Sequence, residues 1–194
     1  IVLFTSDHGC HFKTRNGEYK RSCHESSIRV PTVFTGPGFR GGGRLEELVS
    51  LVDLPPTLLE AAGIETPASM QGRSILPILR GNQNDWQEEV FIQISESQTG
   101  RAVRTARWKY GVDAPEAEGP SADRYVEQYL YDLRADPYEL NNLVGLESHS
   151  SVCQFLSKRL IRRMSEAEES IPHIEPADVI PSGQYRVSDE EVRS

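Results

Sequence analysis

Two adjacent side chains near the start of the chain can bind a divalent cation. Asp7 and His8 follow the apolar residues 1–4 and precede Gly9. A carboxylate supplies the oxygen ligand that a hard cation needs, and a neutral imidazole can complete a mixed site. Adjacent residues on an extended strand point to opposite faces, so both can bind one ion only where the backbone turns, which Gly9 permits. The simpler alternative is a turn in which Asp7 caps the following backbone.

A lysine further along the chain can bind an anion beside that cation. Lys20 lies thirteen residues after Asp7. Its ammonium group can stabilise negative charge on a transferring group and on the oxygen that leaves. Sulfate, phosphate and phosphonate esters all present such oxygens, so charge alone does not choose among them. The alternative is an ordinary exposed loop lysine.

Two histidines and one glutamate in the same region are further candidates. His11 and His24 could protonate a leaving alcohol, or could lie on the surface. Glu25 is expected to form an ion pair with Arg21 or Arg29 that holds the loop, in preference to taking a direct part in catalysis.

Three charged residues in the second half of the chain could reach a substrate bound at the same place. Glu96, Arg101 and Arg104 lie in or after a predicted strand. Exposed charges near a hairpin are the competing interpretation.

The elements that must position these residues begin with the apolar run 1–4. It predicts a strand buried on both faces of a parallel sheet, and ligands of such sheets lie at the carboxyl ends of the strands. Residues 10–27 lack helical or strand periodicity and predict a loop folded over that strand end. Further strands are expected over 28–34 and 48–52.

Two helices are predicted next. Asp53 is the expected N-cap of a helix with prolines 55–56 in its first turn and Gly63 at its end. Ser74 is expected to cap a shorter helix that reaches Leu79 and is closed by Gly81. The residues expected to be buried on the first helix are Leu54, Leu58, Leu59 and Ala62.

From about residue 82 the pattern changes to short strands without a crossover helix between them, so antiparallel pairing is expected. The predicted strands are 90–94, 102–105, 108–112 and 129–133. A helix is expected over 151–168, followed by an extended tail over 171–194. The expected buried residues of this helix are Val152, Phe155, Leu156, Leu160, Ile161 and Met164.

The composition limits the kinds of partner and site that are expected. The 194 residues carry 21 Lys and Arg against 29 Asp and Glu, a net charge of -8, and the basic residues form no run with interleaved aromatics. Nucleic acid is therefore not an expected partner. No apolar stretch reaches the roughly 18 residues of a membrane span. Cys10, Cys23 and Cys153 are odd in number and irregular in spacing, so no disulfide framework or zinc site is predicted, and Cys10 and Cys23 are interpreted as incidental free thiols.

Several strings in order resemble the sulfatase family of the alkaline-phosphatase-like superfamily. They are SDHG at 6–9, KRSCHESSIRVP from Lys20, VSLVDLPPTLLEAAGI, QGRSILPILRG, RTARWKYG and YLYDLRADPYELNNL. This resemblance implies an α/β fold: the end of an α/β sandwich core over 1–81, then a small antiparallel sheet with a helix over 82–170. It also favours a periplasmic or secreted location.

The resemblance implies roles for individual residues. Asp7 and His8 would bind a divalent cation, usually Ca²⁺, and Lys20 would contact the sulfate of a small-molecule or carbohydrate sulfate ester. The family nucleophile is a formylglycine made from the first residue of a C/S-x-P-x-R motif, which this sequence does not contain. We therefore expect the nucleophile upstream of Ile1, on a part of the enzyme that has been cut away, and a fragment that is inactive alone. The alternatives are a phosphonate monoester or phosphodiester hydrolase of the same superfamily, and a non-catalytic anion-binding relative.

Overall fold

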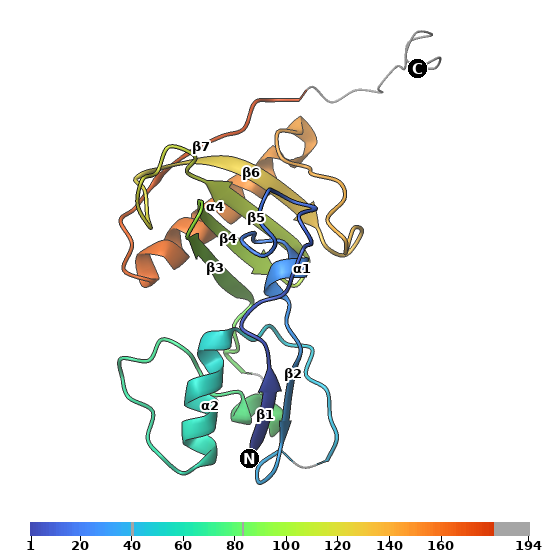
Figure 1. Cartoon of the computed structure of the whole chain (residues 1–194), viewed down its shortest axis with the longest axis vertical. Helices are drawn as coiled ribbons and strands as arrows, with labels where there is room; N and C mark the ends of the chain where they lie inside the picture. The colour runs from blue at the N-terminus through green and yellow to red at the C-terminus, as the bar shows by residue number, and fades with distance from the viewer. Residues whose placement is uncertain (40, 83, 181–194) are drawn as a thin grey trace.

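The computed structural model describes residues 1–39, 41–82 and 84–180, and its largest element is a five-stranded sheet (Figure 1). The strand order is β3-β4-β5-β6-β7, with antiparallel pairs throughout except for the parallel pair of β6 and β7. A bulge at Gly111 and Val112 shifts the register between β5 and β6. The strands are β3 (Glu89–Ser95), β4 (Thr99–Thr105), β5 (Trp108–Asp113), β6 (Arg124–Asp132) and β7 (His173–Glu175).

One face of the sheet is covered by α4 (Ser150–Glu166), which the 3-10 helix η2 (Glu147–His149) precedes. Leu156, Leu160 and Met164 recur at four-residue spacing and form a buried stripe on this helix. The stripe packs against alternate residues of the central strands, among them Val103 and Tyr110. Because strand side chains alternate between faces, the neighbours of these residues point to the opposite side of the sheet.

That opposite side is covered by residues 10–24, which we call the site loop (Figure 1). Cys23 is buried in a second apolar cluster with Ala102 and Tyr129 of the sheet. The His24 ring lies 5.0 Å from the Tyr129 ring and 5.5 Å from the Tyr131 ring, measured between centroids. The sheet therefore has a helix on one face and an irregular loop on the other.

The N-terminal part forms a smaller unit beside the sheet, and the site loop reaches from one to the other (Figure 1). Strand β1 pairs with β2 in an antiparallel ribbon, and the site loop and α1 lie between them in the chain. The elements are β1 (Val2–Thr5), α1 (Glu25–Ile28), β2 (Thr32–Thr35), the 3-10 helix η1 (Leu51–Asp53), α2 (Leu54–Ala61) and α3 (Leu76–Leu79).

Much of the predicted secondary structure is confirmed. All four strands predicted after residue 82 exist and pair antiparallel, and the helix predicted over 151–168 is α4. Helix α2 begins after Asp53 with prolines in its first turn, and α3 follows Ser74, whose Oγ accepts the backbone N–H of Leu76 at 3.2 Å. Gly63 and Gly81 adopt positive φ angles directly after these helices.

The apolar run 1–4 forms a strand as predicted, but the prediction that this strand is buried on both faces is wrong among the described residues. Strand β1 pairs with one antiparallel neighbour, so Val2 and Phe4 are 63% and 66% exposed. A two-stranded ribbon covers neither of its faces by itself. Continuous apolar sequence therefore indicated a strand correctly but not its pairing.

Other corrections concern short elements. Residues 48–50 form no strand, because the carboxylate of Asp53 accepts the backbone N–H of Ser50 at 2.8 Å and turns the chain into η1. On α2, Leu54 is buried but Leu58 and Ala62 are exposed, since little packs over this short helix. Phe155 is 60% exposed, whereas Cys153, which was not among the residues expected to be buried, is 5% exposed. The strand expected over 28–34 begins only at Thr32, because α1 continues to Ile28.

The segment expected to be an extended tail contains β7, which sequence analysis missed because three residues show no periodicity. Its pairing with β6 depends on residues about fifty positions apart in the chain, such as Arg124 and His173. Residues 181–194 of the expected tail lie outside the described residues. In the part that is described, no helix combines the length and the apolar content that crossing a bilayer requires.

Candidate active site

A groove of about 1930 Å³ runs between the N-terminal unit and the sheet, and it brings the main predicted residues together. Asp7, His8 and Lys20 all line it. Strands β3 and β4 and the turn between them contribute the other wall, including Arg104 on β4 and Glu96 in the turn. His11, His24 and Arg101 do not line the groove.

The turn after β1 orients the side chains of Asp7 and His8. Ser6 Oγ donates to the carbonyl of His8 at 2.8 Å, and the backbone N–H of Gly9 donates to the carbonyl of Ser27 at 2.7 Å. A Cβ on Gly9 would lie 2.1 Å from the Ser26 carbonyl oxygen, so only glycine fits here. The turn lets the neighbouring Asp7 Oδ2 and His8 Nε2 approach to 3.6 Å.

The tautomer of His8 follows from its surroundings. Nδ1 lies 2.7 Å from the carbonyl oxygen of Gly9. A carbonyl only accepts hydrogen bonds, so Nδ1 carries the proton in the neutral ring and Nε2 carries the lone pair. That lone pair is the one a metal ligand would use, and the bond from Nδ1 is of the kind that orients metal-binding histidines.

Lys20 completes this cluster. Its Nζ lies 3.1 Å from Nε2 of His8 and 5.6 Å from the centroid of the Tyr19 ring. The ammonium group donates to the imidazole lone pair, and Lys20 is only partly buried, so it can also meet a ligand in the groove. Lys20, which sequence analysis placed beside Asp7 and His8, is therefore a direct neighbour of His8, twelve positions away in the chain.

Asp7 and His8 fit part of a divalent cation site. An oxygen and a nitrogen that each bind one ion at about 2.0–2.6 Å lie roughly 3–4 Å apart, and their separation here is 3.6 Å. Calcium takes about six to eight ligands. Within the described residues, no three His, Cys, Asp or Glu side chains gather so that they could hold a metal ion.

His24 faces the sheet rather than the groove. Its Nε2 lies 3.2 Å from the hydroxyl of Tyr131, and its Nδ1 is hydrogen-bonded with Ser22 Oγ. Burial, and then the charges of Arg15 and Lys109, lower the pKa of His24 to about 3. An imidazole with that pKa is neutral at pH 7, so this conformation gives no support to His24 as a proton donor.

His11 is also buried, with 1% of its surface exposed. Among the described residues neither ring nitrogen has a hydrogen-bond partner. It lies within the site loop, where its backbone N–H donates to the Tyr19 carbonyl at 2.8 Å. Its contribution in this structure is to the packing of the loop that carries Lys20.

Glu25 forms different ion pairs from those expected. Its carboxylate lies 2.7 Å from Lys109 Nζ and 3.4 Å from Arg104 Nε, both on the sheet. Burial raises the pKa of Glu25, but the positive charges of Lys109 and Arg104 outweigh it and the pKa is lowered. Arg21, the partner that was expected, instead binds Glu18 at 3.0 Å and Glu96 at 2.8 Å.

Arg101 is occupied by the protein itself. Its Nε donates to Glu169 at 2.7 Å, and its other nitrogens donate to the carbonyls of Ile94, Gly100 and Pro120 at 2.6–2.8 Å. The side chain is 1% exposed. Arg101 has no nitrogen left for a substrate in this structure, because each of its nitrogens already donates to the protein. Glu96 lines the groove and stays a candidate.

Sequence analysis missed Lys109 and Glu139, which bind Glu25 from the sheet side. Lys109 has no exposed surface, and its Nζ lies 2.6 Å from Glu139 Oε1. The available signal was the position of Lys109 between Trp108 and Tyr110 in a predicted strand. A charge at a sheet position that is covered must find a partner.

The cysteines are free, as predicted. Burial raises the pKa of Cys23 to about 12 and that of Cys153 to about 11. Thiols with such values stay protonated at neutral pH and are poor nucleophiles.

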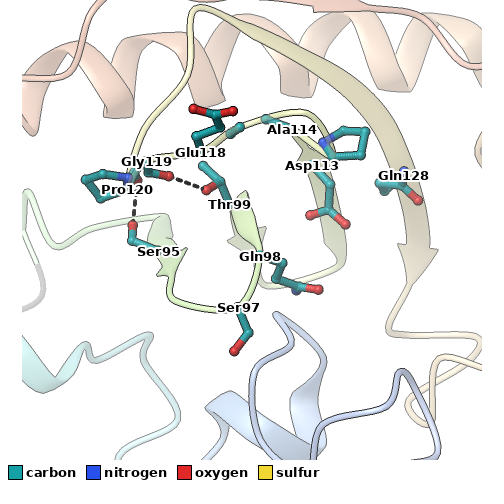
Figure 2. A pocket seen from close by; sticks show the side chains of 12 residues that line it. Ser95, Ser97, Gln98, Thr99, Asp113, Ala114, Glu118, Gly119, Pro120 and Gln128 are labelled. Atoms are coloured by element: carbon teal, nitrogen blue, oxygen red, sulfur yellow. Dashed lines mark hydrogen bonds between the residues drawn. The ribbon is translucent and has the colours of Figure 1, made fainter.

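A second, polar pocket of about 540 Å³ lies where the turn of the β3–β4 hairpin meets the loop after β5 (Figure 2). Ser95 and Thr99 donate to the carbonyls of Pro120 and Gly119, both at 2.7 Å, and tie the loop after β5 to the hairpin. Asp113 points into this pocket. Burial raises the pKa of Asp113 from 3.8 to about 6.

We predict that Asp113→Asn stabilises the protein at pH 7.5 but not at pH 4. The folded state keeps the Asp113 proton up to about pH 6, whereas the unfolded chain loses it near 3.8. Between these values the folded state binds more protons, so stability falls as pH rises and stays lower above pH 6. Asparagine cannot ionise, so the gain at pH 7.5 should be about 2 kcal/mol, allowing for partial exposure. Denaturant unfolding at both pH values measures it, and an equal effect at both would contradict the assigned pKa.

Comparison with known proteins identifies first the class to which this chain belongs, the sulfatases of the alkaline phosphatase superfamily. Residues 17–166 match the family model described as N-sulphoglucosamine sulphohydrolase, C-terminal. The chain belongs to this sulfatase family. The matched region contains Lys20, Glu25 and Lys109 and begins after Asp7 and His8.

Individual relatives agree with this assignment. Arylsulfatase K of Mus musculus is 34% identical over 153 residues, which cover 74% of this chain and 26% of that protein. A multifunctional alkaline phosphatase superfamily protein of Trinickia caryophylli is 30% identical over 184 residues, covering 89% of this chain and 36% of that protein. A solved structure of a 2-O GAG sulfatase matches with a TM-score of 0.72 and 28% identity, covering 86% of this chain and 36% of that one. The chain thus spans about a quarter to a third of the length of these relatives.

Proposed function

We propose that this chain supplies the metal-binding and sulfate-binding residues of a sulfuric ester hydrolase. The observation that carries the proposal is the contact of Lys20 with His8, beside the Asp7 carboxylate, in one groove. Family membership supports the reaction class. The substrate is a small-molecule or carbohydrate sulfate ester, in keeping with the arylsulfatase and the GAG sulfatase among the relatives.

In this proposal, Asp7 and His8 hold a divalent cation, most suitably Ca²⁺, which when bound polarises an ester oxygen as a Lewis acid. His8 keeps Nε2 unprotonated by donating from Nδ1 to Gly9. Lys20 contributes a fixed positive charge against the oxygens of the ester, and this charge matters most where negative charge builds up. Glu96, held by Arg21 at the edge of the groove, is a candidate contact for the rest of the substrate.

The nucleophile is proposed to come from outside these 194 residues, whose sequence contains no C/S-x-P-x-R motif. Formylglycine would supply the attack on sulfur in such an enzyme. We also propose that residues 1–81 complete an alkaline-phosphatase-like α/β sandwich, that residues 82–170 form a separate subdomain and that residues 171–194 form a tail. The groove between the two units is consistent with that division.

The test is an assay of the full-length gene product that contains this chain on matched esters. We expect turnover of 4-nitrophenyl sulfate and none by residues 1–194 alone. A faster reaction with a phenyl phosphonate monoester would favour the runner-up function, a phosphonate monoester or phosphodiester hydrolase of the same superfamily. If the protein is folded but hydrolyses neither of these esters and no sulfated sugar, the result would favour a non-catalytic anion-binding module.

A further inference from the structure

A buried group of charges fastens the helix after the site loop to the sheet. Lys109 on β5 has no exposed side-chain surface, and its Nζ lies 2.7 Å from Glu25 Oε1 and 2.6 Å from Glu139 Oε1. Glu25 is on α1, and Glu139 lies in the turn region after β6. Lys109 therefore joins three segments that are distant in the chain.

The other atoms of these carboxylates reinforce the junction. Glu139 Oε2 accepts the backbone N–H of Glu25 at 2.8 Å, and Arg104 on β4 lies 3.4–3.5 Å from the Glu25 carboxylate. Two cations thus face two carboxylates, so the buried charges balance. Removing one partner would leave an uncompensated charge next to α1.

A second anchor holds the front of the site loop to the same turn. Arg15 donates to the backbone carbonyls of Glu139 at 2.7 Å and of Tyr138 at 2.6 Å. Glu139 itself has a positive φ of 56°, a conformation that costs energy for a residue other than glycine. Lys20 lies five residues after Arg15 and five before Glu25, midway between the two anchors.

Resting on the proposed function, we propose that Lys109 and Glu139 are positioning residues for Lys20. Neither reaches the groove, whereas their partner Glu25 lines it together with Lys20. The Lys109 ammonium and the Glu139 carboxylate fix the Glu25 end of the segment 15–25, and the turn that carries Glu139 holds the Arg15 end through its backbone. Together these contacts set the place of the Lys20 ammonium beside His8. A displacement of about 1 Å at a charge that acts on the reacting group can cost up to about 100-fold in rate.

The test is a double-mutant cycle between Glu139→Gln and Lys20→Ala in the full-length gene product. Glutamine places an N–H₂ where one carboxylate oxygen accepted a hydrogen bond, with little change in size. We expect Glu139→Gln alone to lower kcat about 10-fold or more with less than a threefold change in KM. In the Lys20→Ala background the same change should cost less than twofold, because its effect passes through Lys20. Lys109→Met is the second variant, and it is expected to behave in the same way.

The matched control is Tyr110→Phe. Tyr110 is the next residue on β5, fully buried on the α4 side, and its hydroxyl donates to Glu127 at 2.9 Å. Loss of this hydroxyl destabilises the same strand without changing a contact of the site loop. The kcat of Tyr110→Phe should therefore stay within twofold of that of the unaltered protein. Additive effects of Glu139→Gln and Lys20→Ala, or an equal loss of kcat in Tyr110→Phe, would overturn the proposal.

A readout independent of turnover separates this inference from the proposed function. Hydrogen exchange of backbone amides in residues 10–24 should quicken about 10-fold or more in Glu139→Gln and stay unchanged in Tyr110→Phe. If exchange rises as expected while the unaltered protein hydrolyses no sulfate ester, the anchoring stands and the hydrolase function fails. If exchange in these residues does not change, the anchoring fails whatever the activity.

Discussion

Replacing Lys20 with alanine in the full-length gene product should lower kcat/KM for a sulfate ester by about 100- to 1000-fold. Within the described structure the ammonium of Lys20 contacts His8 and lies over the ring of Tyr19, so its loss should leave the fold intact. The effect should fall mainly on kcat, because the charge opposes negative charge that grows during the reaction. Steady-state kinetics with 4-nitrophenyl sulfate and thermal unfolding of both proteins provide the measurement.

Lys13→Ala is the control for that substitution. Lys13 lies on the same loop, is exposed and does not line the groove, so its removal changes the net charge equally but not the site. Its kcat/KM should stay within twofold of the unaltered protein. A similar loss in both variants would mean that Lys20 acts through general electrostatics and does not contact the ester.

Removal of the His8 imidazole should weaken Ca²⁺ binding by at least about 10- to 100-fold. The neutral ring offers Nε2 beside the Asp7 carboxylate, so His8→Ala removes one of the two ligands proposed in this chain. Calorimetric titration of Ca²⁺ into protein stripped with a chelator measures the affinity directly, without any need for turnover. His173→Ala, which removes an exposed histidine on β7, should bind Ca²⁺ as the unaltered protein does.

The effects of Lys20→Ala and His8→Ala on Ca²⁺ binding should differ, because both Lys20 and a cation would use the lone pair on Nε2 of His8. Nε2 of His8 cannot accept a hydrogen bond from Lys20 and bind a cation at the same time. Lys20→Ala should therefore leave Ca²⁺ affinity unchanged or tighten it, while it abolishes most turnover. Weaker Ca²⁺ binding in Lys20→Ala, or unchanged binding in His8→Ala, would contradict the proposed cation site.

The sequence predicted the central part of the site because its determinants are local. Asp7 and His8 are adjacent, the turn needs Gly9, and the spacing to Lys20 is fixed within one loop. The antiparallel strands after residue 82 were predictable for the same reason, since each pairs with the next one along the chain.

What the sequence did not predict depends on contacts between distant segments. Glu25 was expected to form an ion pair with Arg21 or Arg29. Its carboxylate instead binds Lys109, and its backbone N–H donates to Glu139, which lies 114 positions away in the chain. Arg101 looked like an exposed charge, but the segment after α4 brings Glu169 to it and buries it. Periodicity describes which face of an element is apolar, and it carries no information about which charged residue of another segment will meet that face.

The covering of the sheet by an irregular loop has a consequence for the order of folding. Strands β3 to β6 are joined by hairpin connections and α4 follows soon after, so this layer can form from contacts that are close in sequence. The site loop and α1 must instead close chain segments of 79 to 124 residues to reach Arg104 and Glu139. Such closures are slow because their entropy is lost before the contacts form. The groove is thus expected to be the last part of the molecule to assemble, on a sheet that has already taken its final shape.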